Sequence, residues 1–212
     1  MSDEFYRAFE EHYRGSRETI LERLNAYRPF FSPFLEHEED PVAVDFGCGR
    51  GEALEYMGSL GFVASGVDLD ESMLAACEER GLPAEKEDMM DHISRLPSAS
   101  ASVLSAFHVV EHIAFDDLRA FVKEGLRVLK PGGLLIMETP NPENISVATR
   151  NFYLDPTHNK PLPADLLSFV TEYTGFRRNK VLRLQEPHCL KQKEDVTLQD
   201  WVSGASPDYA VV

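Results

Sequence analysis

Short apolar runs and amphipathic segments alternate along the middle of the chain. Apolar runs occupy 42–46, 62–67, 101–107 and 134–139, with a weaker, short strand pattern at 83–87. Continuous apolar runs of this length are typical of strands that are buried on both faces. The segments between them repeat apolar residues at helical spacing, as at 52–60 and 71–80. This alternation predicts an α/β fold with a mostly parallel central sheet and helices on both of its faces.

The helix before the fifth strand has a well-marked apolar side. Its apolar positions are Leu118, Phe121, Val122, Leu126 and Leu129. The sequence Lys130-Pro131-Gly132-Gly133 follows, and we expect it to end the helix because proline and glycine both disfavour helix continuation.

The C-terminal third is more irregular. Prolines predict a loop at 139–144, and a polar, aromatic-bearing loop is expected at 151–163. A helix at 164–173 that ends at Gly175 and strands at 176–185 and 209–212 complete the pattern, with the seventh and last strand antiparallel. The inserted segment 186–207 is a candidate mobile lid. We assign 141–212 to the acceptor side of the molecule.

The N-terminal segment 1–40 predicts a helical cap in front of a core at 41–140. Ser16 is a candidate helix N-cap, and an apolar face follows it: Ile20, Leu21, Leu24 and Tyr27. Pro29, Pro33 and the acidic run 36–40 are expected to separate this cap from the core. The length of 212 residues suits a single domain. Because the chain stops inside an apolar strand, we also expect it to be trimmed from a longer protein, in which a fused or docked biosynthetic domain would be a partner.

Charge and cysteine content exclude several classes of partner. The formal net charge is −15, which argues against nucleic acid or an anionic membrane surface as the main partner. No apolar segment is long enough to cross a bilayer. The cysteines, Cys48, Cys77 and Cys189, are widely spaced and odd in number. They favour reduced thiols and a cytoplasmic location over a disulfide framework.

The first strong chemical signal follows the strand at 42–46. Its pattern is Asp45-x-Gly47-x-Gly49-x-Gly51, with a helix directly after it. A strand, a glycine turn and a helix bring the backbone close to a nucleotide-like ligand. A dinucleotide fingerprint would need glycine at 52, where Glu52 stands, so the pattern disfavours a nicotinamide-dependent oxidoreductase. The Asp45 carboxylate suits a ligand that carries an ammonium group.

Acidic residues also end the next two strands. Asp68 lies about 20 residues after the glycine turn, where an acid holds ribose hydroxyls, and Leu69 would lie against adenine. Asp88 and Met89 are placed to bind the adenine amino group and ring. Arg17 on the N-terminal helix is a candidate partner for a ligand carboxylate.

These motifs, together with the run Leu126-Arg127-Val128-Leu129-Lys130-Pro131-Gly132-Gly133 and the strand after it, resemble the class I S-adenosylmethionine (SAM) methyltransferases over roughly 42–140. The resemblance implies a Rossmann-like seven-stranded fold, SAM as cofactor, and methyl transfer. Together with Arg17 of the N-terminal helix, the predicted cofactor-binding residues are Asp45, Gly47, Cys48, Gly49, Gly51, Asp68, Leu69, Asp88, Met89 and Phe107. A non-catalytic interaction module with this fold is the alternative, which the intact glycines and Asp68 disfavour.

A second signal, His108-x-x-Glu111-His112, follows the strand at 101–107. It matches a zinc-peptidase pattern, but that chemistry needs both histidines on one helix. The segment is also similar to RNA 2′-O-methyltransferases of the small-RNA pathway, in which a glutamate–histidine pair and a later histidine hold a divalent metal. That similarity implies catalytic or metal-binding roles for His108, Glu111, His112 and His158, with His108 where that family has glutamate. A hydrogen-bonded histidine cluster without metal is the alternative.

The loop at 151–163 indicates the acceptor. Aromatic rings beside polar side chains suit a sugar, which stacks on apolar faces and offers hydroxyls for hydrogen bonds. Candidate substrate-binding residues are Asn151, Tyr153 and Asp155. The stretch resembles methyltransferases of bacterial surface-polysaccharide (O-antigen-type) biosynthesis, which implies O-methylation of a sugar hydroxyl on a glycan. The alternative acceptor is a small phenol or quinone-type molecule.

Overall fold

The computed structural model describes residues 13, 15–185 and 206–212. Seven strands form one sheet in the order β3-β2-β1-β4-β5-β7-β6. The strands are β1 (Val42–Phe46), β2 (Val63–Asp68), β3 (Ala84–Lys86), β4 (Ala101–Phe107), β5 (Leu129–Pro140), β6 (Val181–Leu184) and β7 (Asp208–Val211). Strand β1 is parallel to β2 and β4, β2 is parallel to β3, and β7 is antiparallel to β5 and β6. This confirms the predicted mostly parallel sheet with an antiparallel last strand.

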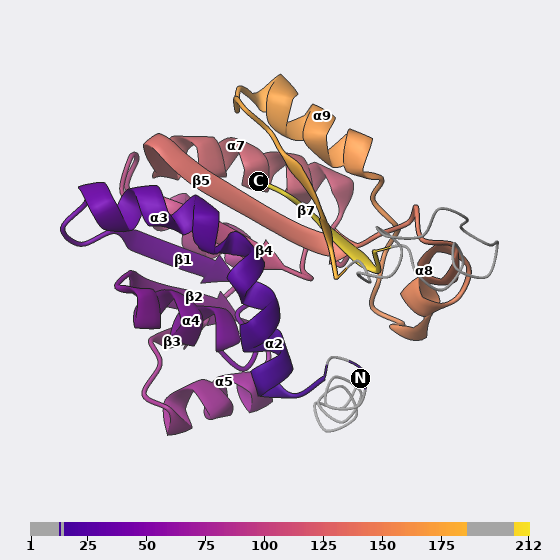
Figure 1. Ribbon diagram of the computed structural model, residues 1–212, viewed down its shortest axis with the longest axis horizontal. Helices are drawn as coiled ribbons and strands as arrows, with labels where there is room; N and C mark the ends of the chain where they lie inside the picture. The colour runs from indigo at the N-terminus through magenta and orange to yellow at the C-terminus, as the bar shows by residue number, and fades with distance from the viewer. Residues whose placement is uncertain (1–12, 14, 186–205) are drawn as a thin grey trace, which may run out of the picture. The chain divides into compact units, whose positions relative to one another are not determined.

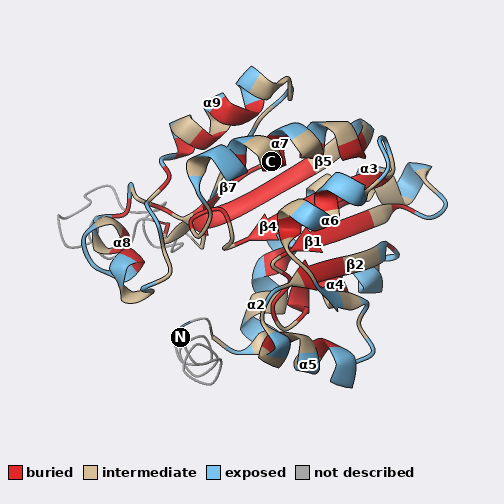
Figure 2. Cartoon of the chain, turned by 180° about the vertical axis from the view of Figure 1, so that it is seen from behind, coloured by how far each residue is buried: buried red, intermediate tan, exposed pale blue. Residues whose placement is uncertain are grey.

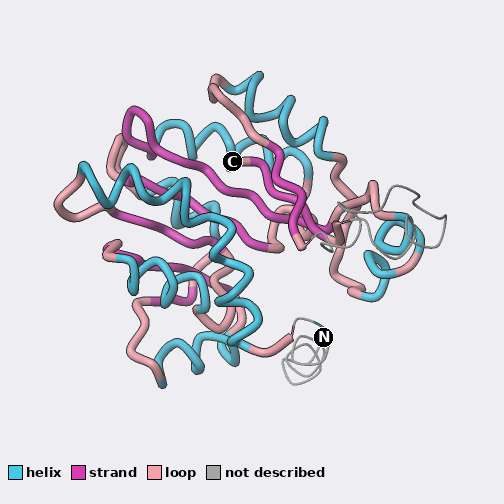
Figure 3. The backbone as a smooth tube through the Cα atoms, viewed as in Figure 1, coloured by secondary structure: helices cyan, strands magenta, loops and turns pink. Residues whose placement is uncertain are grey.

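Helices alternate with the strands along most of the chain (Figure 3). They are α2 (Arg17–Leu24), α3 (Arg28–His37), α4 (Glu52–Leu60), α5 (Glu71–Glu79), α6 (Met89–Arg95), α7 (Phe115–Val128), α8 (Ile145–Thr149) and α9 (Ala164–Thr174), with 3-10 turns η1 (Asn25–Tyr27) and η2 (Asn151–Leu154). Among the described residues, no helix has the length and apolarity needed to span a membrane.

The chain divides into two compact units. The first comprises residues 1–106 and 127–135, and the second comprises residues 107–126 and 136–212. The first unit therefore contains the glycine turn and the acids that follow β2 and β3. The second unit contains the histidines and the predicted acceptor segment.

Strand β4 is buried throughout and β1 is buried except at Val42, while the helices of the first unit keep an exposed side (Figure 2). The N-terminal helices follow the predicted pattern. The Ser16 side chain caps α2 by accepting a hydrogen bond from the Thr19 N–H, and α2 packs against α4 (Figure 1). Phe31 of α3 is fully buried and packs its ring edge against Phe62.

The expected break between cap and core at Pro29 and Pro33 is wrong, because α3 runs through both prolines. Pro29 lies in the first turn, where a backbone N–H has no intrahelical partner to lose. Pro33 removes one helical hydrogen bond from the interior of α3. The buried Phe31 offsets that cost by anchoring the helix on the core.

The helix and strand boundaries around 126–134 also differ from the prediction. Leu126, expected on the apolar face of α7, is 41% exposed, and Val128 is buried in its place. Leu129 belongs to β5, which includes the expected stop signal Lys130–Gly133 and reaches Pro140. Helix α7 ends at Val128 as the stop signal requires, but the chain turns directly into extended backbone.

Three further boundaries in the second unit were placed wrongly. Pro140, expected in the loop, belongs to β5 because it pairs with β7 at the strand end, where a missing proline N–H costs little. The expected loop at 151–163 begins with the 3-10 turn η2. Strand β6 begins at Val181 instead of 176, after Arg178 adopts a left-handed φ of 63°. The candidate lid at 186–207 lies almost entirely outside the described residues.

Gly66 of β2 leads to a stability prediction. A Cβ at this position would lie 2.8 Å from the Cys48 Cβ and 2.9 Å from the Asp45 backbone oxygen. Gly66→Ala should therefore lower the free energy of unfolding by about 1–3 kcal/mol, the usual cost of overpacking. Gly58→Ala is the matched control. It has open space around the new Cβ in helix α4 and should raise stability by about 0.5–1 kcal/mol. Urea unfolding of both variants measures the difference, and equal effects would contradict the packing argument.

Candidate functional site

The glycine turn after β1 has backbone conformations that require glycine. Gly47, Gly49 and Gly51 have φ values of 68°, 52° and 83°. A Cβ on Gly51 would lie 2.6 Å from Leu82 Cδ1 and 2.8 Å from Cys77 Sγ. The turn is fixed to β2, because the N–H groups of Gly47 and Cys48 both donate to the Val67 carbonyl. The turn is thus a rigid loop whose backbone is not shielded by side chains at three positions.

Asp68 connects this loop to the helix that follows β2. Its Oδ2 accepts a hydrogen bond from the Gly49 N–H at 2.8 Å, and its Oδ1 accepts one from the Asp70 N–H at 2.8 Å. A carboxylate oxygen has two lone pairs, so each oxygen can accept a further hydrogen bond. Asp68 therefore has the position and the acceptor capacity predicted for a ribose partner.

The other predicted cofactor residues of the first unit have varied surroundings. Asp45 is only 2% exposed, and its Oδ1 accepts a hydrogen bond from Ser105 Oγ at 2.6 Å. Leu69 is 63% exposed, so its side chain is accessible to a ligand. Asp88 caps α6 by accepting from the Met90 N–H, and Met89 is buried.

Arg17 and Cys48 have partners within the protein. Arg17 Nε donates to Glu55 Oε2 at 3.0 Å, so its guanidinium is engaged by α4. The contact with the Cys77 thiol, together with burial, holds the pKa of the Cys48 thiol above its usual value. A ligand carboxylate would have to compete with Glu55 for Arg17.

These residues fit SAM. Three glycines expose the backbone of the turn, and Asp68 offers carboxylate lone pairs next to it. Asp88 and the exposed Leu69 follow neighbouring parallel strands. This donor and acceptor set suits a nucleoside with free ribose hydroxyls and no phosphate.

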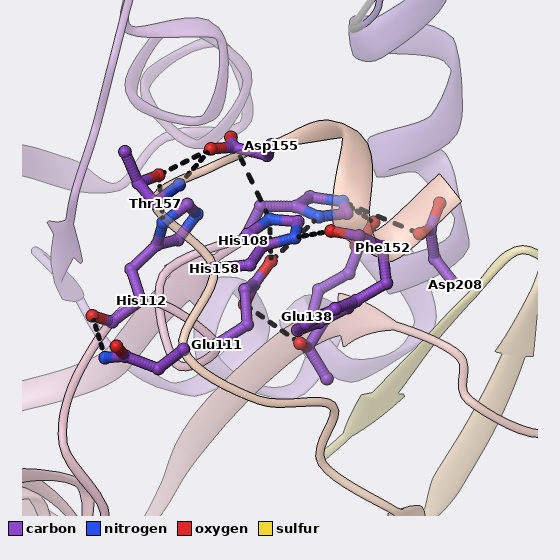
Figure 4. Close-up of polar contacts among 11 residues, drawn as sticks. His108, Glu111, His112, Glu138, Phe152, Asp155, Thr157, His158 and Asp208 are labelled. Atoms are coloured by element: carbon purple, nitrogen blue, oxygen red, sulfur yellow. Dashed lines mark hydrogen bonds and ion pairs between the residues drawn. The ribbon is translucent and has the colours of Figure 1, made fainter. Parts of the chain in front are cut away.

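The second unit brings the predicted histidines together at a cluster of carboxylates (Figure 4). His108 has a left-handed φ of 57°, which is uncommon for a non-glycine residue. Its Nδ1 lies 3.4 Å from Glu111 Oε1, and its Nε2 lies 3.3 Å from Glu138 Oε1 and 4.0 Å from Asp208 Oδ1. Burial opposes a charge on this ring, but the carboxylates of Asp208, Glu111 and Glu138 outweigh it and hold the pKa of His108 well above its usual value.

Glu111 is the buried centre of the cluster. It is 1% exposed, and its Oε2 accepts a hydrogen bond from Thr139 Oγ1 at 2.8 Å. Its Oε1 makes no hydrogen bond, and it lies 3.4 Å from His108 Nδ1 and 3.9 Å from His158 Nε2. Burial would raise the pKa of this carboxyl, but the His108 imidazole more than compensates and lowers it. Glu111 is therefore an ionised carboxylate whose Oε1 faces two histidines without a close hydrogen bond.

His112 and His158 each use Nδ1 for a hydrogen bond. Thr157 Oγ1 donates to Asp155 Oδ1 at 2.6 Å, so it accepts from His112 Nδ1 at 2.8 Å. His158 Nδ1 lies 2.6 Å from the Phe152 carbonyl, which can only accept. In both neutral rings the proton is therefore on Nδ1 and Nε2 has a bare lone pair. Burial lowers the pKa of His112, which favours this neutral form.

The four residues predicted to be catalytic or metal-binding therefore separate into two sets. Ligand atoms of Glu111, His112 and His158 lie within 4.8 Å of one another, whereas His108 groups with Glu138 and Asp208. Sequence reasoning missed Glu138, Asp208, Thr139 and Thr157. A single acid in the apolar run 134–139 was a usable signal for Glu138, because an unpaired buried acid is rare.

The predicted substrate residues lie beside this cluster in sequence but differ in exposure. Tyr153 is 65% exposed, and its ring packs edge-on against Phe152. Asn151 is also exposed. Asp155 is instead hydrogen-bonded to both the backbone and the hydroxyl of Thr157. Phe107, predicted to contact the cofactor, ends β4 and is buried.

Comparisons with known proteins agree with these features. A family model described as a methyltransferase domain matches residues 44–137. A probable SAM-dependent methyltransferase of Mycolicibacterium smegmatis is 32% identical over 79% of this chain and 60% of that protein. A ubiquinone biosynthesis O-methyltransferase of Maricaulis maris is 30% identical over 59% of this chain and 48% of its own length. The chain therefore spans less than two thirds of the curated relatives it matches.

The structural comparison covers the whole chain. The crystal structure of a SAM-dependent methyltransferase from Archaeoglobus fulgidus is 31% identical, with a TM-score of 0.84 over 98% of both chains. The chain thus shares its fold with a structure of this family. The chain belongs to the SAM-dependent methyltransferases, and SAM is its cofactor.

Proposed function

We propose that this methyltransferase transfers the methyl group of SAM to a hydroxyl oxygen of a sugar in glycan biosynthesis. The observation that carries the proposal is the cluster of Glu111, His112 and His158. It offers three acceptor atoms for which the described residues provide no close hydrogen bond: Glu111 Oε1, His112 Nε2 and His158 Nε2. A phenol or carboxylate acceptor would have little need of them, because these groups ionise far more readily than an alcohol.

The chemistry of an alcohol acceptor explains the need for the cluster. SAM supplies a methyl group that is already activated by its sulfonium. The chain's own residues must align the hydroxyl and accept its proton as the carbon–oxygen bond forms. Alignment contributes up to about 7–11 kcal/mol of barrier reduction, and a positioned base contributes roughly 10²–10⁴-fold in rate.

A short stretch of chain connects the cofactor residues to the cluster. Ser105 of β4 pairs with Asp45 of β1 and donates a hydrogen bond to its carboxylate. His108 follows Ser105 by only three residues, and Glu111 follows His108 by three more. Ligands of open α/β sheets bind at the carboxyl ends of the strands, where both segments begin. We therefore propose, from the order of these residues in the chain, that the cluster takes part in methyl transfer from SAM.

The sugar assignment rests on the segment around η2. Tyr153 presents an exposed aromatic ring, and the exposed Asn151 offers an amide for hydroxyl groups. Aromatic faces beside polar groups suit a ring that is apolar on its faces and polar at its rim. Asp155 is engaged by Thr157, so we propose that it acts on the acceptor through His112 and not by direct contact.

Transfer of labelled methyl groups tests the proposed acceptor. With radiolabelled SAM, polysaccharide or lipid-linked glycan acceptors should become labelled in an alkali-stable linkage. Tyr153→Ala should raise the KM for the glycan by roughly 10-fold with a smaller change in kcat, since one stacking surface is lost. Tyr173→Ala on α9 is the matched control, because that ring is 76% exposed and lies outside the proposed site.

A small phenol or quinone-type acceptor is the second candidate. It is favoured by the ubiquinone biosynthesis O-methyltransferases among the relatives. Labelling of catechols but of no glycan, under matched conditions, would replace the sugar proposal with this one. Labelling of neither class, with SAM binding intact, would contradict both.

A further inference from the structure

We propose that Glu111, His112 and His158 form a three-ligand site for a divalent transition-metal ion, and that His108 is not one of its ligands. The ligand atoms of these three residues lie within 4.8 Å of one another (Figure 4). That spacing allows one ion to contact all three with small side-chain movements, because metal–ligand distances for nitrogen and oxygen are about 2.0–2.2 Å.

The protonation states suit a metal ion. Phe152 and Thr157 bind the Nδ1 protons of His158 and His112, so the remaining ring nitrogens are lone-pair donors. A metal ion binds the neutral imidazole, and a partner on the other nitrogen fixes which nitrogen is available. The surroundings of both histidines thus hold them in the tautomer that a metal ion requires.

The Oε1 atom of Glu111 is an independent observation. Glu111 is 1% exposed and its Oε2 accepts from Thr139, whereas its Oε1 makes no hydrogen bond and faces His108 Nδ1 only at 3.4 Å. A buried carboxylate oxygen without a donor is costly, and native proteins normally provide a partner for it. An ion between Glu111 and the two histidines would give Oε1 the close partner that His108, at 3.4 Å, does not provide.

The outer hydrogen bonds complete the arrangement of a metal centre. Asp155 accepts from Thr157, and Thr157 accepts from His112, so a carboxylate acts on the ligand through a hydroxyl. Such indirect partners orient metal-binding histidines and make them more basic. Asp155 and Thr157 are therefore positioning residues in this proposal.

The geometry removes His108 from the ligand set. Its Nδ1 faces Glu111 Oε1 at 3.4 Å, and its Nε2 faces Glu138 Oε1 at 3.3 Å. Both ring nitrogens are thus directed at carboxylates, and neither groups with the ligand atoms of His112 and His158. His108 instead bridges Glu111 to the end of β5.

The donor set indicates the class of ion. Two imidazole nitrogens and one carboxylate oxygen suit zinc, manganese, iron or cobalt, whereas calcium prefers oxygen ligands alone. Three protein ligands leave coordination positions open, as in catalytic sites. The role of the ion as a Lewis acid toward a hydroxyl rests on the proposed function, but its binding does not.

Metal binding can be measured without any acceptor. The EDTA-stripped protein should take up one equivalent of Zn²⁺ or Mn²⁺ in calorimetry, and Co²⁺ should give a d–d absorption band. His158→Ala should weaken binding at least 100-fold, while its SAM affinity stays as in the wild type and shows that the fold is intact. Absence of metal uptake by the stripped protein, or unchanged affinity in His158→Ala, would overturn the site.

Two milder variants test the details. Thr157→Val should weaken metal binding about 10- to 100-fold, and Thr157→Ser should restore it, since the hydroxyl is what fixes the tautomer of His112. His108→Asn, whose asparagine tolerates the left-handed backbone, should still bind one equivalent. Loss of binding in His108→Asn would overturn the three-ligand assignment. Tight metal binding without methyl transfer to any glycan would refute the proposed function and leave the metal site standing.

Discussion

Asp68→Ala should bind SAM roughly 10- to 100-fold more weakly than the wild-type protein, in calorimetry at pH 7. The carboxylate is the charged acceptor available to the ribose hydroxyls, and hydrogen bonds to charged groups contribute about 1.5–3 kcal/mol each. The same carboxylate receives the Gly49 and Asp70 N–H groups, so its removal also loosens the glycine turn. The loss of the ribose acceptor and the loosening of the turn both weaken SAM binding, and the turn has no other acid that could replace Asp68.

Asp70→Ala is the matched control for this loss. Asp70 lies two residues further along and caps α5 by accepting from the Ser72 and Met73 N–H groups. Its replacement should lower the free energy of unfolding by about 0.5–2 kcal/mol, the usual cost of an N-cap. SAM affinity should change only a few-fold. Wild-type SAM affinity in Asp68→Ala would show that the ribose is held elsewhere. Equal losses of SAM affinity in the two variants would show that the effect comes from the loosened loop and not from a lost ribose contact.

The cofactor half of the molecule could be predicted because its signals are local. An apolar run, a turn with glycines at alternate positions and an acid at the next strand end are all contiguous in sequence. The structure places Gly47, Gly49 and Gly51 in conformations that favour glycine, and Asp68 directly against Gly49. Local pattern fails where tertiary packing decides, as in α3, where the buried Phe31 keeps Pro29 and Pro33 inside one helix.

The division of the histidine cluster could not be read from the sequence. His108 stands three residues before Glu111 and His112 directly after it, and both precede the same helix, α7. What separates them is the left-handed backbone of His108, which directs its ring toward Glu138 and Asp208. Asp208 is 100 positions away along the chain, since it stands at the start of β7. Contacts between strands that are far apart in sequence leave no periodic pattern in the sequence from which they could be predicted.

Glu111→Gln should reduce the single-turnover rate of methyl transfer by about 10²–10⁴-fold, the usual contribution of a proton-transfer or charge-positioning group. The amide keeps the size of the side chain and can still accept from Thr139. It also places an N–H₂ group where Glu111 Oε1 now stands, near His158 Nε2. An acceptor thus becomes a donor at the centre of the cluster, while SAM affinity should stay within a factor of about two because the glycine turn and Asp68 are untouched.

Glu143→Gln is the control for the loss of one carboxylate from the same unit. Glu143 is half exposed and forms an ion pair with Arg183, an interaction that contributes little at a surface. The single-turnover rate of Glu143→Gln should stay within about twofold of the wild type, as expected for a surface substitution. Rapid-quench assays at saturating SAM and acceptor compare the two variants directly. If the Glu111→Gln enzyme kept most of its rate, the cluster would have no part in methyl transfer. A proton acceptor or metal ligand at the reacting oxygen cannot lose its charge without a large change in the activation barrier.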